Sequence, residues 1–145
     1  MAGKGDLRDS MVKRAAELNI SDYISFPGFI QDTEVPSLFL QSDVFMMPSV
    51  SEPFGIVTLE AMQAGIPVII SKQSGVSEIL ENAIKIDYWD VQEMANALLE
   101  LLSNRNLYDR LRKNGKKETS QVLWENSAAQ IRQIYVNLLK DIASL

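Results

Sequence analysis

A strand, a turn, a helix and a second strand follow one another between residues 43 and 70, and no other stretch constrains the fold as strongly. Residues 44–47 form a short apolar run ended by Pro48, which is typical of a strand buried on both faces. The apolar, β-branched run at residues 67–70 has the same character. Because a helix separates two buried strands, we expect a parallel β-α-β unit.

The turn between the first strand and the helix has the features of an anion site. Pro53 fixes one φ angle of the turn, and Gly55 lets the backbone approach a ligand closely. The free N–H groups of Phe54, Gly55 and Ile56 would form the positive end of the helix dipole. A negatively charged group such as phosphate is therefore expected at this helix N-terminus.

Two carboxylates flank this helix N-terminus. Glu52 lies in the turn, and Glu60 shares a helix face with Ile56, since residues four apart are neighbours on a helix. Taken alone, the two glutamates are more often structural: Glu52 would complement the helix N-terminus, and Glu60 would be a solvated helix residue. The pair by itself does not establish a ligand site.

Alternating strands and helices continue on both sides of this unit. Residues 23–26 and 83–86 are expected to be further strands, so the sequence predicts an α/β fold with a doubly wound, Rossmann-like parallel sheet. Ligands of such sheets bind beyond the carboxyl ends of the strands. The turns at residues 27–30, 49–54 and 71–75 all follow strands, and we expect them together at that edge.

Helical spacing predicts the segments that cover the sheet. Asp32 or Thr33 is expected to cap a short helix, and Asp90 with Glu93 forms a capping box for a long amphipathic one. Ser127 is expected to cap the last helix, with Trp124 just before it in the core. The apolar face of that helix comprises Ile131, Ile134, Tyr135, Leu138 and Ile142. A first helix begins near Leu7 without the strand that should precede it, which predicts that the chain opens inside a β-α unit.

The composition excludes several classes of function. With 46% hydrophobic and 23% charged residues, the 145 residues fit one globular domain spanning 1–145, and no apolar run approaches the roughly 20 residues that span a bilayer. The absence of Cys and His excludes Ser-His-Asp and zinc chemistry within this chain. A net charge of −5 argues against nonspecific nucleic-acid binding. A cytoplasmic protein is the default expectation.

One long motif resembles that of a known enzyme family. The string Glu-Pro-Phe-Gly-x-x-x-Leu-Glu-Ala-Met-x-x-Gly-x-Pro-Val at residues 52–68 closely resembles the E-x7-E donor-site motif of retaining GT-B glycosyltransferases, the family 4 and glycogen-synthase-like enzymes. Residues 27–30, Pro-Gly-Phe-Ile, resemble the turn of that family that lies against the nucleotide base, although a plain turn is the alternative. The resemblance implies the C-terminal, donor-binding lobe of a two-lobed enzyme.

The resemblance also implies roles for single residues. Glu60 would accept hydrogen bonds from the two ribose hydroxyls, and Glu52, the candidate catalytic residue, would bind sugar hydroxyls beside the reacting carbon. Retention in this family is usually explained by front-face attack, so Glu52 is a donor-site residue rather than an established nucleophile. The other implied donor-binding positions are Phe54, Gly55, Ile56, Gly28, Phe29 and Ile30.

The implied partners are a nucleotide-sugar, with UDP, ADP or GDP as the nucleotide, and an N-terminal acceptor lobe of the same polypeptide. No nucleic acid, metal or other cofactor is implied, and any peripheral membrane association would occur through that other lobe. The family's phosphate-binding Arg and Lys lie upstream of the segment where this chain begins, and only Lys72 lies in the donor turns. The chain alone is therefore predicted to have no transferase activity.

Three other interpretations remain open from the sequence. A nonhydrolysing nucleotide-sugar 2-epimerase shares the two-lobed fold but would lack the string at residues 52–68. A noncatalytic module of the receiver type would need an acidic cluster at strand ends, whereas Asp43 begins a strand. A purely structural domain would leave the string unexplained.

The aromatic pair Tyr88 and Trp89 is more often a cover over a helix end than a ligand platform.

Overall fold

The computed structural model describes the backbone of residues 1–122 and 124–143, with side chains to residue 140. The chain divides into two compact units, Met1–Gln41 and Ser42–Leu145. The expectation of one domain over residues 1–145 stays a prediction.

The first unit is mainly helical. It contains α1 (Arg8–Glu17), the 3₁₀ turn η1 (Ser21–Tyr23) and α2 (Val35–Leu40). The strand predicted at residues 23–26 was wrong: η1 occupies its start, and the extended backbone that follows is paired only at an isolated bridge between Ala2 and Gly28. A strand needs a neighbour along its length, and in this unit residues 1–3 offer only a single pairing position.

The second unit contains a parallel sheet of three strands in the order β1-β2-β3. The strands are β1 (Phe45–Met47), β2 (Val68–Ser71) and β3 (Ile84–Ile86). Phe45 is in register with Val68, and Ile69 with Ile84. Every residue of β2 is buried, which confirms the prediction of a central strand covered on both faces.

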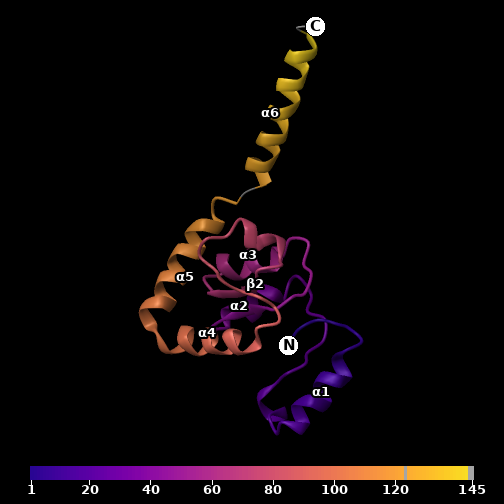
Figure 1. Ribbon diagram of the computed structural model, residues 1–145, viewed down its shortest axis with the longest axis vertical. Helices are drawn as coiled ribbons and strands as arrows, with labels where there is room; N and C mark the ends of the chain where they lie inside the picture. The colour runs from indigo at the N-terminus through magenta and orange to yellow at the C-terminus, as the bar shows by residue number, and fades with distance from the viewer. Residues whose placement is uncertain (123, 144–145) are drawn as a thin grey trace. The chain divides into compact units, whose positions relative to one another are not determined.

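Among its described residues, the second unit also contains five helical segments. They are α3 (Ile56–Gln63), the 3₁₀ helix η2 (Gly75–Glu78), α4 (Val91–Ser103), α5 (Arg105–Thr119) and α6 (Trp124–Ala143). Figure 1 shows α3 and α4 on either side of β2, and α5 packs against both helices. Together with the parallel sheet, this arrangement confirms the α/β prediction.

The core between the sheet and the C-terminal helices is apolar. Ile69 and Ile86 from the strands pack with Met94 and Leu101 of α4 and with Leu111 of α5. Ile69 and Leu101 are fully buried, and each buried side chain of this size stabilises the fold by about 1.5–3 kcal/mol. This packing fixes the strands whose carboxyl ends carry the site described below.

Local capping signals were only partly right. Half of the predicted capping box forms: the Asp90 carboxylate accepts the Glu93 N–H at 2.9 Å and begins α4, whereas the Asp90 N–H donates to the Asp87 carbonyl. In contrast, α2 begins after Glu34 without a side-chain cap, so Asp32 and Thr33 do not cap it. Likewise α6 begins at Trp124, three residues before the expected cap at Ser127.

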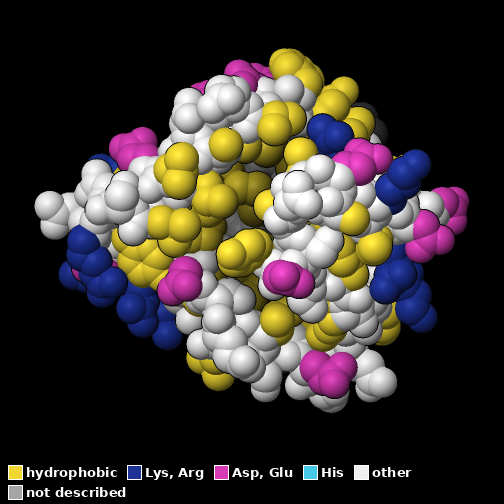
Figure 2. All heavy atoms as spheres, turned by 90° about the horizontal axis from the view of Figure 1, so that it is seen from below, with side chains coloured by type: hydrophobic (Ala, Val, Ile, Leu, Met, Phe, Trp, Pro, Cys, Tyr) yellow, Lys and Arg dark blue, Asp and Glu magenta, His cyan; other side chains and the backbone are white. Residues whose placement is uncertain are grey.

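Large apolar side chains are also exposed. Figure 2 shows hydrophobic side chains at the surface among Lys, Arg, Asp and Glu side chains. Trp124 is 80% exposed, so its expected place in the core was wrong. The predicted apolar face of α6 is exposed at Ile131, Ile134, Tyr135 and Leu138, while the side chain of Ile142 lies outside the described residues.

Candidate functional site

The turn between β1 and α3 is held by the backbone of the neighbouring turn, which joins β2 to η2. The Gly75 N–H donates to the Glu52 carbonyl at 2.9 Å, and the Val76 N–H donates to the Phe54 carbonyl at 2.7 Å. The two strand-end turns predicted at residues 49–54 and 71–75 therefore lie side by side. Glu52, which is half-buried, takes its position from this pairing.

Two glycines permit this close packing. A Cβ atom on Gly75 would lie 2.1 Å from the Pro53 carbonyl oxygen, a distance that backbone atoms never tolerate. Gly55 has a φ of +100°, and a Cβ atom there would lie 3.0 Å from Met47 Cε. Both positions therefore require glycine, one for space and the other for its left-handed backbone conformation as well.

The N-terminus of α3 presents unpaired backbone donors. The Gly55 carbonyl accepts the Thr58 N–H at 3.0 Å and begins the helix. Within the described part of the chain, the N–H groups of Gly55 and Ile56 have no hydrogen-bond partner. The Phe54 N–H differs from expectation, because it faces Glu52 Oε1 at 3.4 Å, a long and weak contact.

Glu60 lies on the exposed face of α3. Thr58 and Ala61 are fully buried on the other side of the helix, whereas Ile56 and Glu60 are exposed. The Glu60 carboxylate forms no hydrogen bond or ion pair with any residue that the structure describes. Its two oxygens can accept further hydrogen bonds, and it lies one turn after Ile56 on α3.

The other predicted donor-binding residues belong to the first unit. Gly28 has a φ of +83°, and its carbonyl accepts the Gly3 N–H at 2.7 Å. Phe29 is 61% exposed, with the Lys4 ammonium 5.7 Å from its ring centroid. Ile30 is half-buried. Gly28 is thus paired with the start of the chain, and the Phe29 ring beside it is exposed.

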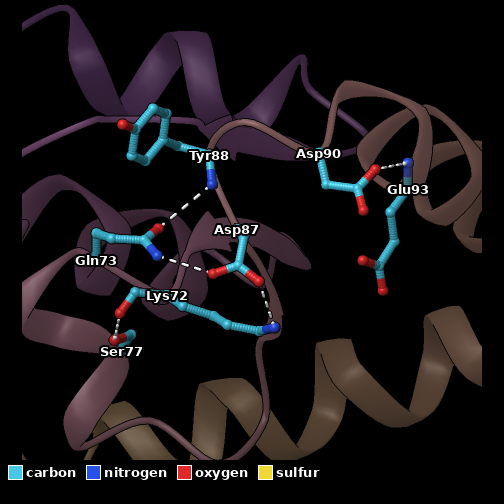
Figure 3. A network of polar contacts seen from close by, with 7 residues as sticks. All are labelled: Lys72, Gln73, Ser77, Asp87, Tyr88, Asp90 and Glu93. Carbon is cyan, nitrogen blue, oxygen red and sulfur yellow. Dashed lines mark hydrogen bonds and ion pairs between the residues drawn. The ribbon is translucent and has the colours of Figure 1, made fainter.

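A polar network joins the ends of β2 and β3 (Figure 3). Lys72 Nζ lies 2.8 Å from Asp87 Oδ2, and Gln73 Nε2 donates to Asp87 Oδ1 at 2.8 Å. The Tyr88 N–H in turn donates to Gln73 Oε1 at 3.3 Å. Sequence reasoning singled out Lys72 but missed its pairing with Asp87 and Gln73. The available signal was that Lys72 and Asp87 each lie within two residues of the end of a predicted strand.

The network shifts the two ionisable groups in opposite directions. The hydrogen bond from Lys72 lowers the pKa of Asp87, and the hydrogen bond to Asp87 raises the pKa of Lys72. The pair is thus charged at neutral pH. Its contribution to stability is lost as the pH falls through the lowered pKa of Asp87, or rises through the raised pKa of Lys72.

Neither a metal cluster nor a membrane span is found in the described residues. Among them, no three Asp or Glu side chains gather as ligands for a metal ion. No helix within residues 1–122 and 124–143 combines the length and the apolar character needed to cross a bilayer.

The fold and the site define a class of protein. A parallel α/β unit in which a glycine-initiated helix with free N–H groups follows the carboxyl end of a strand is typical of a Rossmann-like lobe. Residues 1–118 match the family model described as glycosyl transferases group 1. The chain therefore belongs to the group 1 glycosyltransferases, and its fold is that of a GT-B C-terminal lobe.

Individual relatives agree with this assignment. An uncharacterized glycosyltransferase of Methanocaldococcus jannaschii is 33% identical over 139 residues, which are 93% of this chain and 36% of that protein. A probable sucrose-phosphate synthase of Craterostigma plantagineum is 30% identical over 84% of this chain and 12% of its own length. The chain thus spans about a third or less of the length of these relatives.

Solved structures show the same fold. Sucrose-phosphate synthase of Thermosynechococcus elongatus superposes with a TM-score of 0.79 at 30% identity, over 94% of this chain and 35% of that one. Anabaena HepE in complex with UDP and glucose gives a TM-score of 0.78 at 24% identity, over 99% of this chain and 40% of that one.

Proposed function

We propose that this chain is the donor-binding lobe of a retaining glycosyltransferase that moves a sugar from a nucleotide-sugar to a hydroxyl group of an acceptor. The observation that carries the proposal is the grouping at α3: the free N–H groups of Gly55 and Ile56 begin the helix, with Glu52 in the turn before them and Glu60 on the exposed face one turn later. The family membership supports it, because the matched residues 1–118 include the whole grouping.

Each group suits one part of a nucleotide-sugar. The carboxylate of Glu60 can only accept hydrogen bonds, and a ribose diol offers two donors. The N–H groups of Gly55 and Ile56, at the positive end of α3, suit the diphosphate. When the sugar leaves, charge builds up on that diphosphate, and donors already fixed in place stabilise the charge without reorganising. Glu52, in the adjoining turn, would bind hydroxyls of the sugar next to the reacting carbon.

We further propose that the donor lobe acts together with an acceptor lobe of the same polypeptide, in the cytoplasm. Two of the relatives are about three times as long as this chain, since it covers 36% of the Methanocaldococcus jannaschii protein and 35% of the Thermosynechococcus elongatus one. In the proposed enzyme the second lobe supplies the acceptor site, and Arg and Lys residues upstream of this segment supply further cations for the diphosphate.

Amide NMR titration of the labelled chain with UDP, ADP and GDP, each to millimolar concentration, tests the donor site. One nucleotide is expected to shift amides at residues 28–30 and 54–60 and to leave α5 unchanged, because the base and diphosphate would contact only those segments. The 2′-deoxy form of that nucleotide is the matched ligand control. It should bind more weakly, since the diol would lose one of its donors to Glu60. If none of the three nucleotides shifts any amide signal, either in this chain or in the two-lobed enzyme, the proposal is refuted.

A further inference from the structure

The network between β2 and β3 fixes the turn after β2 from one side. Both oxygens of Asp87 are used: Oδ2 pairs with Lys72 and Oδ1 accepts from Gln73, each at 2.8 Å. The side-chain amide of Gln73 is used at both ends, because its oxygen accepts the Tyr88 N–H. Figure 3 shows Lys72 and Gln73 both directed toward Asp87. The turn after β2 is therefore bound to the end of β3 through these side chains and also through the backbone, where the Lys72 N–H donates to the Ile86 carbonyl at 2.9 Å.

The same turn fixes the Glu52 turn from the other side. Ser71 Oγ donates to the Ser49 carbonyl at 2.7 Å, and the Gly75 N–H donates to the Glu52 carbonyl at 2.9 Å. Gln73 lies between these two anchoring residues. A series of contacts thus connects Asp87 to the backbone of Glu52: the hydrogen bond to Gln73, the short stretch of chain from Gln73 to Gly75, and the hydrogen bond from Gly75 to Glu52.

This series contributes more to position than to stability. The side chains of Lys72 and Asp87 are 51% and 27% exposed, and an ion pair in such a setting adds little to the free energy of unfolding. The turn, however, cannot shift without moving the Glu52 carbonyl, because Gly75 packs directly on Pro53. Loss of the network should therefore be felt at the site before it is felt in the fold.

We propose that Asp87 is a positioning residue of the donor site: through Gln73 and Lys72 it fixes the turn after β2, and through that turn it places Glu52 beside the sugar of the donor. The inference rests on the proposed function. It assigns Asp87 no contact with the donor, and it predicts an effect on the rate of the chemical step rather than on donor binding. Small displacements of a group beside the reacting carbon lower the rate strongly, while binding through Glu60 and α3 is kept.

The first test uses this chain without ligand. In Asp87→Ala, amide signals of Glu52, Phe54 and Gly75 are expected to shift, and the thermal midpoint should change by no more than about 2 °C, because an exposed ion pair adds little to stability. Asp109→Ala is the matched control, since it removes an exposed ion pair of similar length, 2.9 Å to Arg105, on α5. Unmoved signals at Glu52 and Gly75 in Asp87→Ala would overturn the inference.

The second test uses the two-lobed enzyme. Its donor is the sugar conjugate of the nucleotide that binds in the NMR titration, and the test measures release of that nucleotide when water is the acceptor. Asp87→Ala should lower kcat about tenfold with the donor KM within about twofold. Asp87→Asn, which keeps an oxygen for Gln73, should recover most of kcat, and Asp109→Ala should be unchanged. If kcat is unchanged in Asp87→Ala while Glu60→Gln lowers kcat/KM for the donor, this inference is refuted and the proposed function is not. Wild-type donor use in both variants would sink the proposed function as well.

Discussion

Replacing Gly75 by alanine is expected to destabilise the chain by about 3 kcal/mol, the upper end of the range for overpacked positions. The added Cβ atom would lie 2.1 Å from the Pro53 oxygen and 3.2 Å from Phe54 Cα. All of the obstructing atoms are backbone, so no flexible side chain can move aside. The turns after β1 and β2 must then separate, which breaks the hydrogen bond from Gly75 to Glu52. Urea unfolding followed by circular dichroism measures the effect as a lower midpoint.

Gly5→Ala is the matched control for this substitution. A Cβ atom on Gly5 would meet nothing within 4 Å, and its φ lies outside the left-handed range. Its free energy of unfolding should stay within about 0.5 kcal/mol of that of the parent chain, as expected for a surface change. Gly65→Ala tests backbone strain without a steric clash. Gly65 has a φ of +84°, but its Cβ atom would be no closer than 3.6 Å to Arg112. Equal stability of Gly75→Ala and Gly5→Ala would contradict the close packing of the two turns.

The strands β1 and β2 could be predicted because their signal is local. Residues 44–47 and 67–70 are apolar runs between turn residues, and the structure places β1 and β2 within one residue of them. The segment at residues 23–26 carries a similar local signal, but a strand also requires a partner. In the first unit the extended backbone after it pairs with another segment only at the bridge between Ala2 and Gly28. The apolar composition alone therefore predicted a strand that has no partner along its length.

The same distinction holds for the site. Glu52, Gly55 and Glu60 lie within nine residues of one another, so one turn and one helix are enough to bring them together. Lys72 and Asp87 are 15 residues apart, and their pairing depends on β2 and β3 being neighbours. Sequence spacing does not encode that adjacency. For the same reason the capping bond from Glu93 to Asp90, three residues apart, was foreseen correctly.

Glu60→Gln in the two-lobed enzyme is expected to weaken donor use by about 1.5–3 kcal/mol, the usual range for a hydrogen bond to a charged group. Expressed as kcat/KM, this is a loss of about 10-fold to 150-fold. The melting temperature should be nearly unchanged, because the Glu60 side chain is exposed and has no partner among the described residues. Glu100→Gln on α4 is the matched control, since it removes an exposed carboxylate from a helix without altering the site.

A change of donor preference distinguishes a ribose-binding role for Glu60 from a general disturbance of the site. If its carboxylate accepts the 2′-hydroxyl, the wild-type enzyme should favour the ribonucleotide donor over its 2′-deoxy form, and Glu60→Gln should reduce that preference. The two losses should then be less than additive, as expected when both changes remove the same hydrogen bond. Fully additive losses would place Glu60 away from the ribose. A lower melting temperature with unaltered donor kinetics would instead make Glu60 a structural residue of α3 and leave the N–H groups of Gly55 and Ile56 as the basis of the site.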